Sequence, residues 1–239
     1  MALINDFLSL IYPRHCEACS NTLFAHEHLL CTYCRVNLPR SHFHVQRDNE
    51  LSRLFYGRVP FLSASAYYLY EKSGRVQKLI HSIKYQKQFQ LAEHLGSCYA
   101  TELQEIALPG SVDLLVPIPL HPKKQKIRGF NQSEYFARGM GRIWNKEVNT
   151  SLLKRIRETS TQTRKKKYER WENVEGIFTT ANPEALEQKH VMLVDDVITT
   201  GATLEAAWMA LQGIPSIRVS VVSMAFASRS FAGLAKDAG

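Results

Sequence analysis

VMLVDDVITTGAT, residues 191–203, is the stretch of sequence that decides the expected fold. Its first four residues are all apolar, which is typical of a strand covered on both faces in the centre of a parallel sheet. The pattern predicts that a turn over residues 195–203 follows this strand, and that Gly213 and Pro215 end the helix after the turn. The apolar residues of that helix recur at helical spacing, at Leu204, Ala207, Trp208 and Leu211.

The predicted turn carries the chemistry of a site for a phosphorylated sugar. Asp195 and Asp196 at the end of the strand would accept hydrogen bonds from two adjacent hydroxyls, each worth roughly 1.5–3 kcal/mol. A ribose 5-phosphate would satisfy both the carboxylates and the loop. The alternative is an acidic strand end followed by a threonine N-cap, which leaves two buried carboxylates in mutual repulsion with nothing gained. The loop residues that can surround the phosphate with N–H groups and hydroxyls at a helix N-terminus are Thr199, Thr200, Gly201, Ala202 and Thr203.

The composition is that of a globular protein with one substantial domain and a small appendage: 239 residues, of which 45% are hydrophobic and 22% charged. No apolar run reaches the length of a membrane span, and residues 1–12 lack the basic leader and cleavage site of a signal peptide. We therefore expect no membrane span and a cytoplasmic location, with a short amphipathic helix at the N-terminus.

Four of the five cysteines form two C-x-x-C pairs separated by 11 residues. This spacing lets Cys16, Cys19, Cys31 and Cys34 take the corners of a tetrahedron and favours a structural zinc ribbon. The alternatives are disulfides, which a cytosolic chain disfavours, and redox motifs, which would not need two copies. His15 is the best substitute ligand among the nearby histidines.

The rest of the chain alternates predicted strands and helices. A half-buried strand over residues 62–70 is followed by helices at 75–85 and 89–107, a buried strand at 113–120, a helix after Asn131 and a last strand at 219–227. This order predicts a parallel α/β sheet with ligand loops at the C-terminal ends of its strands. We expect an N-terminal helix and zinc ribbon in residues 1–40, a linker in 41–60, the main domain in 61–228 and a loosely held tail in 229–239.

The segment after the second predicted strand is a candidate ligand loop. Pro117 ends that strand, either as a simple terminator or to stiffen a loop that binds a ligand. Asn131 and Glu134 resemble a capping box, which places Arg128 in the loop that opens a helix. The planar guanidinium of Arg128 suits a phosphate at this position.

Basic residues concentrate in residues 121–170, which hold 15 of the 30 Lys and Arg but four of the 22 Asp and Glu. Such a region is either a solvated basic face or a surface that binds a polyanion, such as a phosphorylated ligand or nucleic acid. Aromatic side chains at 168 and 171 can stack on bases, whereas Phe136 and Trp144 fall on a helical stripe and are predicted core. The candidates for binding single-stranded DNA are Lys123, Lys124, Lys126, Lys165, Lys166, Lys167, Tyr168, Arg170 and Trp171.

Residues 191–203 are similar along all their positions to the 5-phosphoribosyl 1-pyrophosphate (PRPP) loop of the type I phosphoribosyltransferases. RGFNQ at 128–132, TQTRKKKYERWENVEGIF at 161–178 and the two C-x-x-C pairs narrow the resemblance to the ComF family, the competence-associated branch of that fold. The chain departs from the family at Thr163 and Arg164, where leucine is usual, and has lysines at 123, 124 and 126 where several arginines are usual. Lysine keeps the charge but loses bidentate geometry toward pyrophosphate.

The resemblance implies a type I phosphoribosyltransferase fold with a zinc ribbon, and magnesium bound together with PRPP. It also implies a role in the uptake of single-stranded DNA during natural transformation, beside a competence helicase and the DNA-uptake channel. One alternative is an active phosphoribosyltransferase of nucleotide metabolism, in which an acceptor displaces pyrophosphate at C1. Another is a regulator that senses PRPP without turning it over. The implied PRPP-binding residues are Asp195 and Asp196, which would also be catalytic, with Thr199, Thr200, Gly201, Ala202, Thr203, Pro117 and Arg128.

Overall fold

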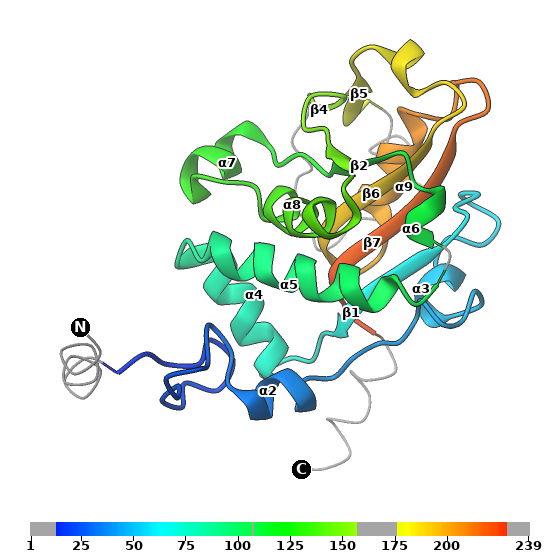
Figure 1. Cartoon of the computed structure of the whole chain (residues 1–239). Coiled ribbons are helices and arrows are strands. Elements are labelled where there is room, and N and C mark those ends of the chain that lie inside the picture. The colour runs from blue at the N-terminus through cyan, green and yellow to red at the C-terminus, as the bar shows by residue number, and fades with distance from the viewer. Residues whose placement is uncertain (1–12, 107, 157–175, 229–239) are drawn as a thin grey trace.

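The computed structural model describes residues 13–106, 108–156 and 176–228, and its centre is a five-stranded parallel sheet (Figure 1). Every pairing in this sheet is parallel, which confirms the expected α/β fold. In spatial order the strands are β1 (Ala64–Leu69), β7 (Arg218–Phe226), β6 (His190–Ile198), β2 (Leu114–Pro117) and β3 (Glu147–Val148).

Helices cover the sheet, with α4, α5 and α8 packed together over one face and α9 on the other (Figure 1). α7 projects beyond the sheet next to α8, and α2 lies beside the start of α4, where the Arg75 guanidinium is 4.9 Å from the centre of the Tyr33 ring. The helices are α2 (Thr32–Asn37), α3 (Glu50–Arg53), α4 (Arg75–Tyr85), α5 (Phe89–Leu103), α6 (Leu108–Ser111), α7 (Pro122–Arg128), α8 (Gln132–Trp144) and α9 (Ala202–Met209), with a 3-10 turn η2 (Pro183–Leu186).

Alternating side chains of β6 divide the core between the two faces. Met192 and Val194 belong to the cluster under α4, α5 and α8. Val191 and Leu193 belong to the second cluster, which includes Leu204 of α9. Because successive strand residues point to opposite faces, this alternation also decides where the two carboxylates that follow the apolar run are directed.

β6 extends to Ile198, beyond the strand end expected at Asp195, because its pairing with β7 continues to Ile198 and Phe226. α9 begins at Ala202 and ends at Met209, ahead of the predicted stop at Gly213. The loop between β6 and α9 is therefore residues 199–201, shorter than the predicted turn over residues 195–203.

β1 is buried on both faces, although its sequence predicts a half-buried strand. Residues 39–41 run along its outer edge, where Ser41 N donates to Tyr67 O (3.2 Å) and Leu69 N donates to Pro39 O (2.8 Å). The Arg40 guanidinium lies 4.1 Å from the centre of the Tyr67 ring. This covering segment satisfies an edge that would otherwise expose unpaired backbone groups.

Residues 41–60 pack against the second core cluster, in contrast to the expected linker. Their short helix α3 begins with a capping box between Asn49 and Ser52. Leu51 and Phe55 are buried. The segment is polar on average, and only its packing partner reveals that these two apolar residues anchor it.

A small antiparallel pair, β4 (Leu153–Arg155) with β5 (Phe178–Thr180), stands apart from the main sheet. Among the described helices there is none whose length and apolar character would let it cross a lipid bilayer. The expected N-terminal helix and the expected C-terminal tail lie outside the described residues.

Candidate functional site

A small open pocket lies at the C-terminal end of β6, where the strand turns into α9. The backbone N–H groups of residues 199–203 donate no hydrogen bond to any described group. Three of these residues, Thr199, Thr200 and Ala202, are exposed. Free N–H groups at the positive end of a helix favour an anion. The pocket is lined by Asp195, Val197, Ile198, Thr199, Thr200, Gly201, Ala202, Thr203 and Leu204.

Gly201 shapes the entry into α9. Its φ is +78°, in the left-handed region, and a Cβ added to it would lie 2.6 Å from Phe55 Cε1. In the same segment as Phe55, Arg58 forms an ion pair with Glu205 in the first turn of α9. Phe55 and Arg58 therefore pack against the start of α9, and nothing in their sequence pattern predicts this contact.

Asp195 is partly buried and points to the α9 side of β6, as the alternation along the strand requires. Its Oδ1 accepts a hydrogen bond from Asp196 N (2.8 Å). Burial, and next the charge of Asp196, raise the pKa of Asp195 to about 7, although the Asp196 N–H and the Lys84 and Arg155 charges act in the opposite direction. A carboxyl with its pKa near neutrality inside a pocket is typical of a functional site.

Asp196 points to the other face of β6, toward α4 and α8. Its Oδ2 lies 2.8 Å from Lys84 Nζ, at the end of α4, and 4.0 Å from Arg128 Nη1. All three side chains are mostly buried, with 15–18% of their surface exposed. Sequence reasoning missed Lys84, because a lysine in the last turn of an amphipathic helix carries no functional signal.

Arg128 ends α7 and donates from Nη1 to Gln132 Oε1 (2.8 Å), which aims the guanidinium toward Asp196. Asn131 caps the N-terminus of α8, as its sequence context predicts. The acidic partner of the expected capping box, Glu134, instead forms an ion pair with Arg138 (2.6 Å). The structure thus brings Arg128 to the same strand end as the two aspartates.

Pro117 is the last residue of β2 and is buried beside Val194 of β6. The loop that follows is held by Asn131 Nδ2, which donates to Ile118 O (3.0 Å). Pro117 itself is buried and is not among the residues that line the pocket.

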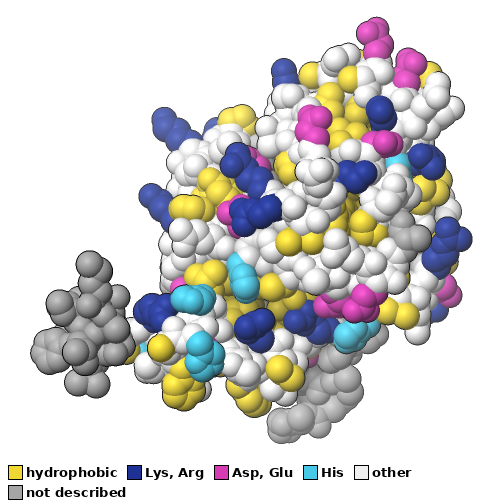
Figure 2. Space-filling model, viewed as in Figure 1, with side chains coloured by type: hydrophobic (Ala, Val, Ile, Leu, Met, Phe, Trp, Pro, Cys, Tyr) yellow, Lys and Arg dark blue, Asp and Glu magenta, His cyan; other side chains and the backbone are white. Residues whose placement is uncertain are grey.

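α7 presents a basic surface next to the site. No residue of this helix is buried, and Lys123, Lys124 and Lys126 are all exposed. Figure 2 shows Lys and Arg side chains gathered over α7 and the neighbouring α8. The other candidates for binding nucleic acid, Lys165, Lys166, Lys167, Tyr168, Arg170 and Trp171, lie outside the described residues.

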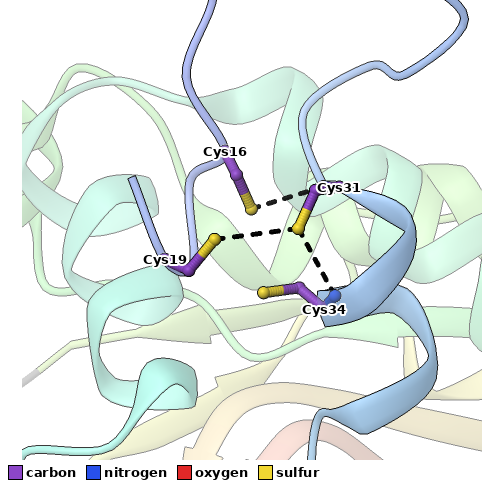
Figure 3. Close-up of side chains that lie close together, drawn as sticks. All are labelled: Cys16, Cys19, Cys31 and Cys34. Atoms are coloured by element: carbon purple, nitrogen blue, oxygen red, sulfur yellow. Dashed lines mark hydrogen bonds between the residues drawn. The ribbon is translucent and has the colours of Figure 1, made fainter. Parts of the chain in front are cut away.

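The four cysteines of the C-x-x-C pairs come together in the structure (Figure 3). Their sulfur atoms lie within 4.8 Å of one another, and Cys19 Sγ is 3.7 Å from Cys31 Sγ. Tetrahedral zinc with Zn–S bonds of about 2.3 Å holds its sulfurs about 3.8 Å apart. The cluster can therefore hold a metal ion, and thiolates in this arrangement fit zinc.

Backbone groups support the sulfur cluster. Cys31 N donates to Cys16 Sγ (3.3 Å), and Cys34 N donates to Cys31 Sγ (3.4 Å). Burial acts to raise the pKa of the Cys16 thiol, but several backbone N–H groups outweigh it and lower the pKa to about 7. Such hydrogen bonds favour the thiolate, which is the form that binds metal. His15, expected as a substitute ligand, instead has its Nδ1 3.1 Å from Ser20 O.

Two glutamates tie the ribbon together and to the main domain. Glu27 accepts from Phe24 N (2.9 Å) and from Thr32 N (2.5 Å), and these hydrogen bonds lower its pKa to about 2. Glu17 accepts from Ser82 Oγ of α4 (2.5 Å). The buried cysteines also belong to the core cluster under α4 and α5, so the ribbon and the domain share one core.

Comparison with known proteins found a matching family model and several similar proteins. A family model described as a phosphoribosyl transferase domain matches residues 143–229. Competence protein F of Haemophilus influenzae is 29% identical over 150 residues, 59% of this chain and 64% of that protein, so this match spans less than two thirds of the relative. DNA utilization protein YhgH of Escherichia coli is 26% identical over 195 residues, 79% of this chain and 80% of that protein. Competence protein ComFC of Bacillus subtilis is 29% identical over 202 residues, 84% of this chain and 79% of that protein.

Proposed function

This chain belongs to the ComF family of the phosphoribosyltransferase superfamily, and we propose that it binds PRPP at the end of β6 and serves the uptake or use of DNA. The observation that carries the PRPP site is the loop at residues 199–203, whose N–H groups have no partner among the described residues while Asp195 stands beside them. A 5-phosphate at the N-terminus of α9 and ribose hydroxyls at Asp195 would satisfy both features.

The two aspartates lie on opposite faces of β6, so a ribose held by both would sit across the end of the strand. Lys84 and Arg128 flank Asp196 and offer positive charge to the pyrophosphate. The carboxylate oxygens of Asp195 and Asp196 are of the type that magnesium prefers, and magnesium bound with PRPP would neutralise the pyrophosphate. In a transferase, these residues would hold the ribose while an acceptor displaces pyrophosphate at C1.

Isothermal titration of the full chain with PRPP and magnesium tests this site. We expect binding in the wild type, loss of at least tenfold in affinity for Asp195→Asn, and no change for Asp48→Asn, which replaces an exposed aspartate outside the pocket. Removing one charge-assisted hydrogen bond of roughly 1.5–3 kcal/mol accounts for a loss of that size. Equal affinity in Asp195→Asn and wild type would contradict the assignment, and so would competition by inorganic phosphate but not by ribose 5-phosphate.

The second candidate function is contact with single-stranded DNA through α7. The observation that favours it is an exposed helix with lysines at 123, 124 and 126 on the rim of the site. The relatives' names, competence protein and DNA utilization protein, support a role of this kind. Lysines paired with phosphates release counterions, so such binding weakens steeply with salt.

A salt series of single-stranded DNA affinities tests the α7 surface. In the double variant Lys124→Ala with Lys126→Ala, affinity should fall and the slope of log K against log salt should become shallower by about 1.4, or about 0.7 per phosphate contact. The matched control replaces two exposed lysines outside α7, Lys72→Ala with Lys78→Ala. An equal loss in both double variants would mean that binding follows net charge alone.

We further propose that the cysteine cluster holds structural zinc and that the protein works in the cytosol. None of the five cysteines forms a disulfide, and cysteines that bind metal instead of pairing are usual in a reducing compartment. All four ligands of the cluster come from the protein, which closes the site to substrate and suits a structural rather than a catalytic ion.

A further inference from the structure

A second group of metal-binding side chains lies where the segment after α2 meets the C-terminal end of α5, away from both α7 and the cysteine ribbon (Figure 1). The group consists of His42, His44 and Glu102, and one ligand atom from each lies within 4.8 Å of the other two. No sequence pattern predicted this group, because Glu102 follows His44 by 58 residues in the chain.

We propose that His42, His44 and Glu102 form a binding site for a divalent transition-metal ion of the zinc class. His44 Nε2 lies 3.7 Å and His42 Nδ1 lies 3.9 Å from Glu102 Oε1. These distances are too long for hydrogen bonds. Around a tetrahedral ion with bonds of about 2.1 Å, neighbouring ligand atoms stand about 3.4 Å apart. The two distances from the imidazoles to Glu102 Oε1 therefore need to shorten by a few tenths of an ångström, and the ligand atoms of the two histidines lie within 4.8 Å of each other.

Unsatisfied polar atoms point to the same ion. The side chain of His44 is 3% exposed, and its Nε2, the ring nitrogen that faces Glu102, lies too far from Oε1 to form a hydrogen bond. Glu102 Oε1 is likewise buried and unpartnered. A metal ion bound to Glu102 Oε1 would supply the missing interaction.

The surrounding structure holds the three ligands in place. Arg40 Nη1 donates to the other carboxylate oxygen, Glu102 Oε2 (2.7 Å), and so orients Oε1 toward the imidazoles. The Tyr99 ring packs edge-on against the His44 ring, with centroids 6.1 Å apart. His42 sits in a left-handed turn, with φ +53°, that is closed by a hydrogen bond from Val45 N to its carbonyl (3.1 Å).

The site has an open side. The His42 side chain is 67% exposed, so an ion held by these three ligands would keep a coordination position for water or another small ligand. Imidazole and carboxylate ligands without thiolate suit zinc, cobalt or nickel. In this respect the site differs from the closed set of four cysteines.

Counting metal ions on the full chain tests the proposal. After equilibrium dialysis against Zn²⁺, the wild type should hold two ions per chain and His42→Asn one. Asparagine tolerates a left-handed backbone but is too short to replace the imidazole. The affinity of the His42→Asn variant for the second ion should fall at least tenfold, because even the loss of a residue that supports a metal ligand lowers metal affinity about 10–100-fold. The matched control is His81→Gln, which removes an exposed histidine of α4 and should leave two ions.

Cobalt distinguishes the two sites spectroscopically, because thiolate-bound Co²⁺ gives a charge-transfer band that imidazole and carboxylate ligands do not. We expect His42→Asn and Glu102→Gln to keep this band and lose the second equivalent. If Glu102→Gln fails to fold, His42→Asn decides. One ion per chain in the wild type, or two ions retained in His42→Asn, would overturn the proposal, as would an equal loss in His81→Gln.

Discussion

Replacing Gly201 by alanine should damage both the fold and the phosphate loop. The backbone at Gly201 has φ +78°, a conformation that costs a non-glycine residue roughly 1–2 kcal/mol. The added Cβ would also lie 2.6 Å from Phe55 Cε1 and 3.0 Å from Phe55 Cζ. Phe55 is 2% exposed and packs edge-on against Phe61, with centroids 4.8 Å apart, so its ring cannot swing away freely. Such overpacking costs roughly 1–3 kcal/mol, which gives a total loss of about 2–5 kcal/mol.

A matched variant separates the two contributions. Gly57 also has a positive φ, +69°, but a Cβ added there meets nothing within 4 Å. Gly57→Ala should therefore cost only the conformational part, roughly 1–2 kcal/mol. In the double variant Gly201→Ala with Phe55→Leu, the shorter side chain relieves the clash, so the total loss should be smaller than the sum of the single losses by roughly 1–3 kcal/mol.

Urea unfolding followed by far-UV circular dichroism measures these free energies, and titration with PRPP and magnesium measures the site. We expect Gly201→Ala to lower the free energy of unfolding by more than Gly57→Ala does, and to weaken PRPP binding while Gly57→Ala leaves it unchanged. The reasoning fails if Gly201→Ala unfolds within about 0.5 kcal/mol of the wild type, the range of an ordinary surface substitution. It fails equally if Phe55→Leu and Gly201→Ala prove additive.

Three further perturbations test the site and the ribbon. The pKa of Asp195 is raised to about 7 in the folded chain, so ionisation of this carboxyl destabilises the fold as the pH rises toward and through 7. Asp195→Asn should therefore raise the free energy of unfolding more at pH 8 than at pH 5. An equal gain at both pH values would contradict a buried carboxyl. Lys84→Met removes the partner of Asp196 and should weaken PRPP binding about tenfold in a calorimetric titration, whereas Lys78→Met, at an exposed position of the same helix, should not. Cys34→Ser should release zinc from the ribbon and lower the melting temperature seen by calorimetry, whereas Cys98→Ser should retain the zinc; an unchanged melting temperature after zinc loss would refute the shared core.

The parallel sheet and the phosphate loop could be predicted because local patterns encode them. Four apolar residues followed by two aspartates and a threonine-glycine turn specify strand, loop and helix within residues 191–211. The four cysteines could be predicted as possible metal ligands as well, because each C-x-x-C spacing places two ligands on one turn. In both cases the chemistry lies within a few residues of chain, so no distant partner has to be known.

The packing of residues 41–60 against the core was not predicted, for the opposite reason. The mixed polar sequence of this segment has no periodic stripe, and the burial of Phe55 depends on its packing against a loop about 150 residues later in the chain. The prediction that β1 is half-buried was wrong for the same reason. Its pattern does not show that residues 39–41 return to cover its edge.

The sequence by itself determined the type of sheet, the loop that can take a phosphate and the four sulfurs that can hold a metal ion, because each of these follows from short-range periodicity or spacing. Only the tertiary structure decided that Asp195 faces the loop while Asp196 meets Lys84 and Arg128. Only the tertiary structure brought Glu102 to His42 and His44. Contacts between distant segments depend on how helices and strands pack across a shared core, and side chains so distant in the chain leave no common period by which a sequence could reveal them.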